Sequence, residues 1–211
     1  MRREEVSLLA RAMSDVVDGS VPDDPHAALL DAAYDLFSRQ GIQRTTMDDV
    51  ARVAGVSRIT VYRRMVSKEA LVEQVVLREF RRYFDQFLRD VREAETVADR
   101  VVIGFVGSLK AIRGNPLIAA LLTSEPEYAA PSVLGEDGHT LAVVREFLAG
   151  QLRREQEAGQ VGTDVDVELV AELMARVCTS FLLIPSGVVD VDDGDQLARV
   201  ARDYLVPMLG L

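Results

Sequence analysis

Residues 46–65 read TMDDVARVAGVSRITVYRRM, a segment with signals for two short helices joined by a turn. The hydroxyl of Thr46 can accept a backbone N–H three residues later while the acid at that position reaches back, an arrangement similar to a capping box. Gly55 can adopt the positive φ of a tight turn without penalty. Ser57 is placed to cap a second helix of about residues 58–64. Two capped helices separated by a glycine turn predict a helix-turn-helix unit.

The two helices can pack through small apolar side chains. One face of the first helix carries Met47, Val50, Ala51 and Ala54. Val56 can staple against Val61, which turns both inward. The residues left outside have types that read DNA grooves, because Arg donates to guanine, Thr and Ile contact a thymine methyl, and Tyr reaches a phosphate; they are Arg58, Ile59, Thr60, Tyr62 and Arg63. An ordinary helical hairpin with a solvated face is the alternative.

The segments before this unit also have a helical pattern. Residues 27–40 carry one apolar stripe and are followed by Gly41, a residue type that often ends helices. Apolar side chains three and four apart in residues 4–17 favour a further short helix. Between them, GSVPDDPH at 19–26 contains two prolines and is typical of a linker.

Residues 28–75 resemble the DNA-binding domain of the tetracycline-repressor (TetR) family. The resemblance is carried by ALLDAAYDLFSRQG, then TTMDDVARVAGVSRITVYRRM, then SKEALVEQVV, in that order. It covers about the first third of the chain after the extension. Met65 stands where the family commonly has Phe, and it remains apolar. The leading extension of about two dozen residues is longer than the family's usual start.

The resemblance implies which residues meet DNA. Thr46 and Tyr62 are expected to contact phosphates, as is Lys68 at the start of the next helix, and Arg44 is a further backbone candidate. The base-facing residues are expected to be Arg58, Ile59, Thr60 and Arg63. With the cap Ser57, the expected DNA-binding set is Arg44, Thr46, Ser57, Arg58, Ile59, Thr60, Tyr62, Arg63 and Lys68.

The chain is acidic overall, with a formal net charge of -10, but its charge is unevenly distributed. Residues 39–68 hold seven basic and two acidic side chains, a net charge of +5, so the rest carries -15. Acids farther than about 8 Å from the phosphates are largely screened at physiological ionic strength. The local sign therefore permits DNA binding, and the surplus acid is expected to weaken non-specific association.

The remaining two thirds predict a separate helical domain. Helices are expected over about residues 67–92, 97–113, 116–124, 140–158, 165–184 and 195–209, with 125–138 irregular. The predicted fold class is all-α: an N-terminal three-helix helix-turn-helix domain followed by a helical-bundle ligand-binding and dimerisation domain. The expected divisions are an extension at 1–24, the DNA-binding domain at 25–72 with its motif at 46–65, and the helical domain at 73–211.

The helix at 165–184 has an apolar stripe of double width. It could be the central helix of one monomer, or its second face could pack, with the helix ending near Leu209, against a twin copy in a four-helix interface. Two heads with recognition helices about 34 Å apart would read a palindrome, and the family resemblance also implies a homodimer. The expected interface residues are Leu169, Leu173, Val177 and Leu182.

The resemblance further implies an effector pocket in the helical domain, whose occupant would release DNA. Residues on amphipathic faces near the irregular segment are its candidates, although residues of this kind are more often plain core than pocket lining: Phe105, Leu109, Leu121, Leu122, Tyr128, Phe147, Met174, Cys178 and Phe181. Few charged residues lie on these faces, which favours an apolar or amphipathic effector.

Other function classes find little support. A single cysteine, Cys178, allows no internal disulfide and no cysteine-based zinc site, which suggests a reducing, cytoplasmic compartment. No export signal or membrane span is expected. The histidines, His26 and His139, have no accompanying oxyanion hole or nucleophile elbow, so no enzyme, metal or cofactor is expected. The expected partners are a double-stranded DNA operator, a small-molecule effector and a second copy of the chain, with a protein-binding adaptor as the alternative.

Overall fold

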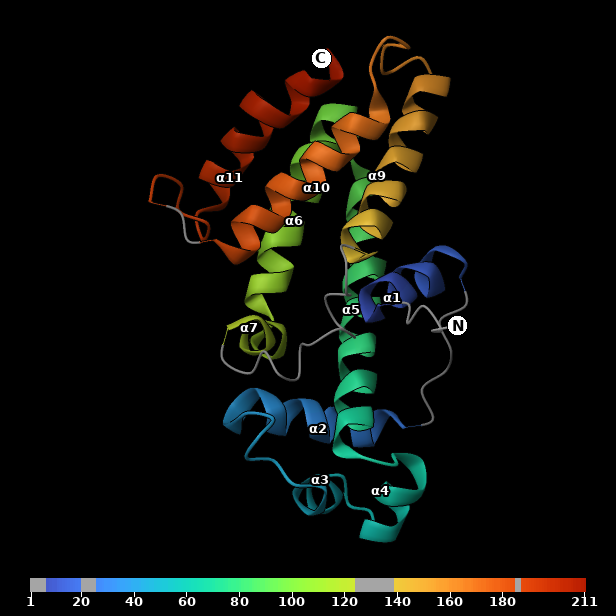
Figure 1. Ribbon diagram of the computed structural model, residues 1–211, viewed down its shortest axis with the longest axis vertical. Helices are drawn as coiled ribbons and strands as arrows, with labels where there is room; N and C mark the ends of the chain where they lie inside the picture. Colours follow the sequence, from blue (N-terminus) through green and yellow to red (C-terminus); the bar gives the residue numbers. More distant parts are fainter. Residues whose placement is uncertain (1–6, 20–25, 124–138, 185–186) are drawn as a thin grey trace. The chain divides into compact units, whose positions relative to one another are not determined.

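The computed structural model describes residues 7–19, 26–123, 139–184 and 187–211, and within these ranges every regular element is a helix (Figure 1). The all-α prediction is confirmed. In chain order the helices are α1 (Leu8–Val17), α2 (Ala27–Gln40), α3 (Met47–Val53), α4 (Arg58–Arg64), α5 (Lys68–Glu93), α6 (Val97–Gly114), α7 (Pro116–Thr123), α9 (His139–Glu157), α10 (Val167–Leu183) and α11 (Gly194–Val200).

The end of the chain differs from the single helix expected over about 195–209. α11 gives way to a π-helical turn at Ala201–Leu205 and a 3-10 turn at Val206–Leu209. Pro207 has no N–H to continue α-helical hydrogen bonding, and Gly210 then takes a φ of 72°. The expectation of one regular helix was therefore wrong beyond α11. The irregular segment expected at 125–138 lies outside the described residues.

The chain divides into two compact units. The first unit contains α1 to α4, α5 as far as Phe84, and α7, and the second contains the rest of α5 with α6, α9, α10 and the C-terminal turns. This contact-based division falls inside α5, whereas the sequence placed a domain boundary after residue 72. That boundary remains a prediction.

Three helices of the first unit, α2, α3 and α4, form what we call the reading head. α3 packs against both α2 and α4. Its core is made of side chains that are almost completely buried, namely Leu29, Phe37, Ile42, Val50 and Val61. Met65 is also buried, so it fills the core as the sequence suggested.

The N-terminal extension contributes α1 to the first unit. The helix begins after Ser7, whose hydroxyl accepts the N–H of Ala10 at 3.3 Å. Ala12 is fully buried, and Asp15 accepts a hydrogen bond from Nε of Arg81 on α5 at 2.8 Å. α1 is therefore a packed element of this unit.

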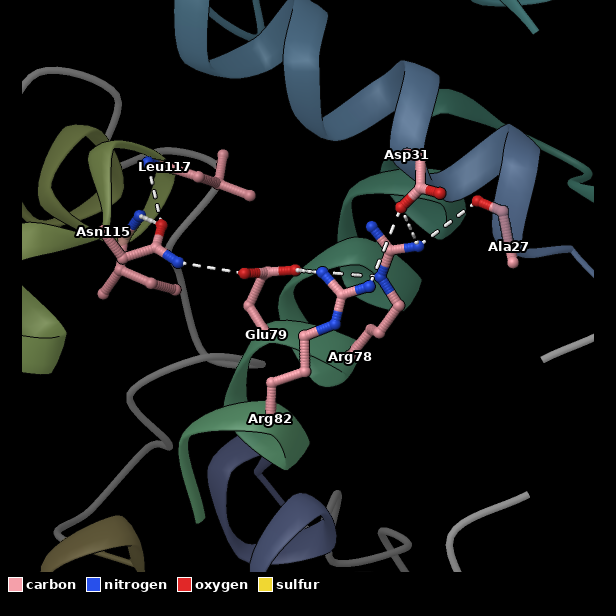
Figure 2. A network of polar contacts seen from close by, with 8 residues as sticks. Ala27, Asp31, Arg78, Glu79, Arg82, Asn115 and Leu117 are labelled. Atoms are coloured by element: carbon pink, nitrogen blue, oxygen red, sulfur yellow. Dashed lines mark hydrogen bonds and ion pairs between the residues drawn. The ribbon is translucent and has the colours of Figure 1, made fainter. Parts of the chain in front are cut away.

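A polar network inside the first unit connects α2, α5 and the start of α7 (Figure 2). Nη1 of Arg78 lies 3.0 Å from an Asp31 carboxylate oxygen. Glu79 accepts from Nη1 of Arg82 at 3.0 Å and from the side-chain amide of Asn115 at 3.1 Å. Asn115 also caps α7, because its Oδ1 accepts the N–H of Leu117 at 3.1 Å. Arg78 and Glu79 are largely buried, so each charge depends on these partners.

The second unit is held by an apolar core. α10 packs against α9 and α6, and α11 packs against α6 (Figure 1). The rings of Phe105 and Phe181 meet edge to face with centroids 5.8 Å apart. Around them, Leu109 and Leu197 are completely buried. Ion pairs such as Arg100 with Glu155 lie at the margin of this core.

Candidate nucleic-acid interface

The start of α3 is fixed by a reciprocal cap. The N–H of Asp49 donates to Oγ1 of Thr46 at 3.1 Å, and the N–H of Thr46 donates to the Asp49 carboxylate at 3.2 Å. This is the capping box that the sequence predicted, with Asp in place of the usual Glu. A seven-residue helix has little stability of its own, so the cap matters for its position.

The turn between α3 and α4 depends on glycine. Gly55 has a φ of +69°, the left-handed conformation that residues with a Cβ rarely adopt. The N–H of Val56 then donates to the carbonyl of Ala51 at 3.0 Å. Ser57 starts α4 by accepting the N–H of Thr60 at 3.2 Å. Val61 is completely buried, and this orients the opposite face of α4 outward.

The outward face of α4 carries the side chains expected to read bases. Ile59 is 80% exposed, and Arg58, Tyr62 and Arg63 are also exposed, while Thr60 is half-buried beside the Ser57 hydroxyl at 2.9 Å. These exposed side chains are available to contact a partner on that face of α4. The structure thus gathers the expected base-facing residues on one short helix.

Arg58 is held by contacts that the sequence did not indicate. Its Nη1 donates to an Asp48 carboxylate oxygen at 3.0 Å, and its guanidinium carbon lies 5.4 Å from the centroid of the Tyr62 ring. Asp48 and Arg58 are ten residues apart, so no helical period relates them. The glycine turn brings the first turn of α3 beside the start of α4.

Apart from Tyr62 on α4, the expected phosphate-contacting residues lie around the loop between α2 and α3. Nε of Arg44 donates to the carbonyl of Gln40 at 2.7 Å, and Nζ of Lys68 donates to the carbonyl of Gln43 at 3.0 Å. The Thr46 hydroxyl donates to the Asp49 carboxylate at 2.6 Å. Its only proton is therefore used within the cap, and contact with a phosphate would require that proton to leave Asp49.

The acid of this cap is strongly stabilised in its charged form. The hydrogen bond from the Thr46 hydroxyl, followed by that from Arg52, lowers the pKa of Asp49 from 3.8 to about 2. Nη2 of Arg52 lies 2.8 Å from the carboxylate. Asp49 is therefore ionised under any condition in which DNA binding would be measured.

The candidate effector-pocket residues are mostly core residues of their own unit. In the second unit, Phe105, Leu109 and Met174 are buried, and Cys178 and Phe181 pack against the same core. Burial raises the pKa of the Cys178 thiol to about 12. The Phe147 ring lies 6.1 Å from that of Phe87. Leu121 is fully buried in the first unit.

The side chains of two further pocket candidates are not described. Leu122 belongs to α7, but its side chain is not among those described, and Tyr128 lies outside the described residues.

The expected dimer residues on α10 separate into two groups. Leu169 is 54% exposed and Leu173 is also exposed, whereas Val177 and Leu182 pack against the core of the second unit. Leu183 and Ile184 are exposed large apolar residues that the sequence prediction did not include. α10 thus presents apolar side chains to solvent as well as to its core.

The described residues contain neither a candidate membrane span nor a cluster of metal-binding side chains. No helix there has the length and apolar composition that crossing a membrane requires. No group of three or more His, Cys, Asp or Glu side chains in the same ranges is arranged to hold a metal ion.

Comparison with known proteins identifies the relatives of this chain. The family described as bacterial regulatory proteins, tetR family, matches residues 29–75. The chain is 30% identical over 183 residues to the uncharacterised HTH-type transcriptional regulator Rv1255c of Mycobacterium tuberculosis, covering 86% of this chain and 83% of the relative. It is 28% identical over 189 residues to the HTH-type transcriptional repressor KstR2 of Rhodococcus jostii, covering 84% and 85%.

Solved structures share the fold. Salmonella enterica GusR superposes with a TM-score of 0.66 at 22% identity, covering 90% of this chain and 98% of that one. The TetR family repressor AlkX of Dietzia superposes with a TM-score of 0.57 at 24% identity, covering 87% and 96%. Members of this group are transcriptional regulators, and the comparisons offer no support for an adaptor that does not bind DNA.

Proposed function

Since the chain belongs to the TetR family of DNA-binding transcriptional regulators, we propose that it represses transcription as a homodimer on a palindromic operator and is released by a small apolar or amphipathic effector. The observation that carries this proposal is the outward face of α4, which is capped, basic and exposed beside a glycine turn. As a regulator of this kind it would act in the cytoplasm and have no enzymatic activity.

On the operator, α4 would enter the major groove. Arg58, Ile59, Thr60 and Arg63 would face base edges, because they lie on or beside the exposed face of α4. Tyr62, Arg44 and Lys68 would contact the phosphate backbone. Thr46 and Ser57 cap α3 and α4, which positions the residues that would meet the DNA.

The exposed apolar face of α10 would be covered by a second copy of the chain. Leu169, Leu173 and Leu183 repeat at helical spacing on the side facing away from the unit's core. Burying this face against its twin removes apolar surface from water in both copies. The resulting two-fold axis would relate two reading heads, as a palindrome requires.

The effector proposal rests on the apolar interior of the second unit. A relative in the same fold group, FadR of Bacillus subtilis, was solved with stearoyl-CoA, and AlkX of Dietzia is implicated in biodegradation of n-alkanes. Such molecules share a long apolar part. A similar occupant would fit among side chains such as Phe105, Met174 and Phe181.

Binding-site selection from a random DNA pool tests the DNA-binding part of the proposal. We expect enrichment of a palindrome with half-sites about one helical turn apart, or a multiple of it. Affinity should fall with salt at a log-log slope of about -0.9 per phosphate contacted. Failure to enrich any sequence, or affinity independent of salt, would contradict the proposal.

A charge on the α10 face tests the dimer. Leu173→Asp should weaken self-association by at least about tenfold, because the interface would have to bury an unpaired carboxylate. Val188→Asp is the matched control, since Val188 is 93% exposed and lies outside α10. Sedimentation analysis that found equal association for both variants would contradict the α10 interface.

A further inference from the structure

Arg58 and Asp48 form an exposed ion pair between α4 and α3. Arg58 is the first residue of α4, and its Nη1 donates to Oδ2 of Asp48 in the first turn of α3 at 3.0 Å. On its other side the guanidinium lies near the Tyr62 ring, 5.4 Å from the centroid. The guanidinium of Arg58 is thus positioned by two neighbouring side chains in the absence of DNA.

The neighbouring charges are arranged differently. Asp49 is occupied by its own cap and by Arg52, so it is not available to Arg58. Within the part of the chain that the structure describes, Arg63 and Arg64 at the end of α4 form no ion pair. Among the basic side chains of α4, Arg58 is therefore the one whose direction is set by an acid.

We propose that Asp48 is a positioning residue that sets DNA specificity: it directs Arg58 toward base edges and makes the same guanidinium less available to phosphates. This inference rests on the proposed function, in which α4 reads an operator. One N–H of Arg58 is committed to Asp48, and the four others remain free to donate to acceptors such as O6 and N7 of guanine.

The chemistry of non-specific DNA explains the selectivity. On random DNA a matching base meets Arg58 only by chance, so binding depends mainly on phosphate oxygens, and these must compete with the Asp48 carboxylate for the guanidinium. The operator places a matching base edge opposite Arg58, and Arg58 would donate to it through its other N–H groups while still paired with Asp48. Both partners of the pair are more than half exposed, at 65% and 55% of the side chain, so its strength is modest. An effect of several-fold is the expected scale.

The primary test is Asp48→Asn, which keeps the size of the side chain and removes its charge. Non-specific affinity should rise about three- to fivefold, and the log-log salt slope on random DNA should steepen by about 0.9, the value for one added phosphate contact. Operator affinity should change less than about twofold, so the ratio of operator to random affinity falls. Asp35→Asn, an exposed acid on α2, is the control for loss of charge alone.

A double-mutant cycle separates positioning from general electrostatics. In an Arg58→Ala background, Asp48→Asn should no longer change the affinity ratio, because there is no guanidinium left to direct. Asp48→Glu retains a carboxylate and should recover at least half of the lost specificity. Since Asp48 also lies in the first turn of α3, circular dichroism should confirm that each variant is folded.

Two results would overturn the inference. In one, Asp48→Asn raises operator and random affinity equally, as Asp35→Asn would. In the other, Asp48→Asn still changes the ratio of operator to random affinity in the Arg58→Ala background. If the wild-type protein enriches no palindrome at all, the proposed function fails, and this is distinguishable because it is seen before any variant is made.

Discussion

The reading head and the second unit are stabilised by different kinds of contact. In the head, α3 and α4 have seven residues each, and individual polar atoms fix where they begin and what Arg58 faces. In the second unit, a continuous apolar cluster from α6, α10 and the C-terminal turns holds the helices together. The head should therefore be sensitive to the loss of single hydrogen bonds, and the second unit to the loss of volume.

Loss of volume in the second unit should have the largest effect on stability. Leu109 is completely buried, so Leu109→Ala leaves a cavity and should cost about 4 kcal/mol of unfolding free energy. Leu109→Met keeps most of the volume and should cost less than about 1.5 kcal/mol. Urea unfolding measures both. Equal losses for the two variants would mean that volume is not what this core requires.

Removal of a buried charge in the first unit should have the next largest effect on stability. Glu79 accepts from Arg82 and Asn115 and lies next to the buried Arg78, so Glu79→Ala removes one of the two acids beside these arginines and leaves the Asn115 amide without its acceptor. The expected loss is about 3 kcal/mol. Glu73→Ala, an exposed acid on the same helix, should cost less than about 0.5 kcal/mol in the same unfolding experiment. Equal losses for Glu79→Ala and Glu73→Ala would mean that the network in Figure 2 contributes nothing to stability.

Substitutions of the exposed basic residues on α4 and at the start of α5 should change DNA affinity and not stability. Arg63 is exposed, so Arg63→Ala should cost about 1 to 3 kcal/mol on the operator and less on random DNA. Lys68→Ala should weaken both alike, because a phosphate contact carries no sequence information. Titration of each variant against both DNAs measures this. Equal weakening by Arg63→Ala would reassign Arg63 to the phosphate backbone.

The sequence predicted the head in more detail than the second unit. A helix cap joins residues only three apart in the sequence, so it can be predicted locally. At the predicted caps, the backbone nitrogen lies 3.1 Å from the Thr46 hydroxyl oxygen and 3.2 Å from that of Ser57. The pairing of Asp48 with Arg58 could not be predicted, since it depends on how steeply α3 and α4 cross.

For α10 the sequence placed the helix but could not assign all of its faces. Leu182 follows Leu169 by thirteen residues, which turns it about 140° around the helix, and it packs into the core. Leu183 lies only about 40° from Leu169 and is exposed with it. An apolar stripe of double width contains both kinds of residue, and only the neighbouring helices decide between them.

The smallest expected effect concerns the cap of α3 and appears only in acid. Asp49 has a pKa of about 2 in the folded protein and 3.8 without its partners, so its ionised form stabilises the folded state. That contribution is fully present above about pH 4 and is lost as the pH falls toward 2. Thr46→Ala removes the hydrogen bond that lowers this pKa most. The variant should therefore lose less additional stability than the wild type between pH 4 and 2, because its Asp49 already lacks that partner. Thermal unfolding across this range measures the difference, with Thr96→Ala at the start of α6 as a cap variant outside the head. If Thr46→Ala and the wild type declined in parallel, the carboxylate would not depend on Thr46, and single polar contacts would matter less to the head than the comparison with the second unit implies.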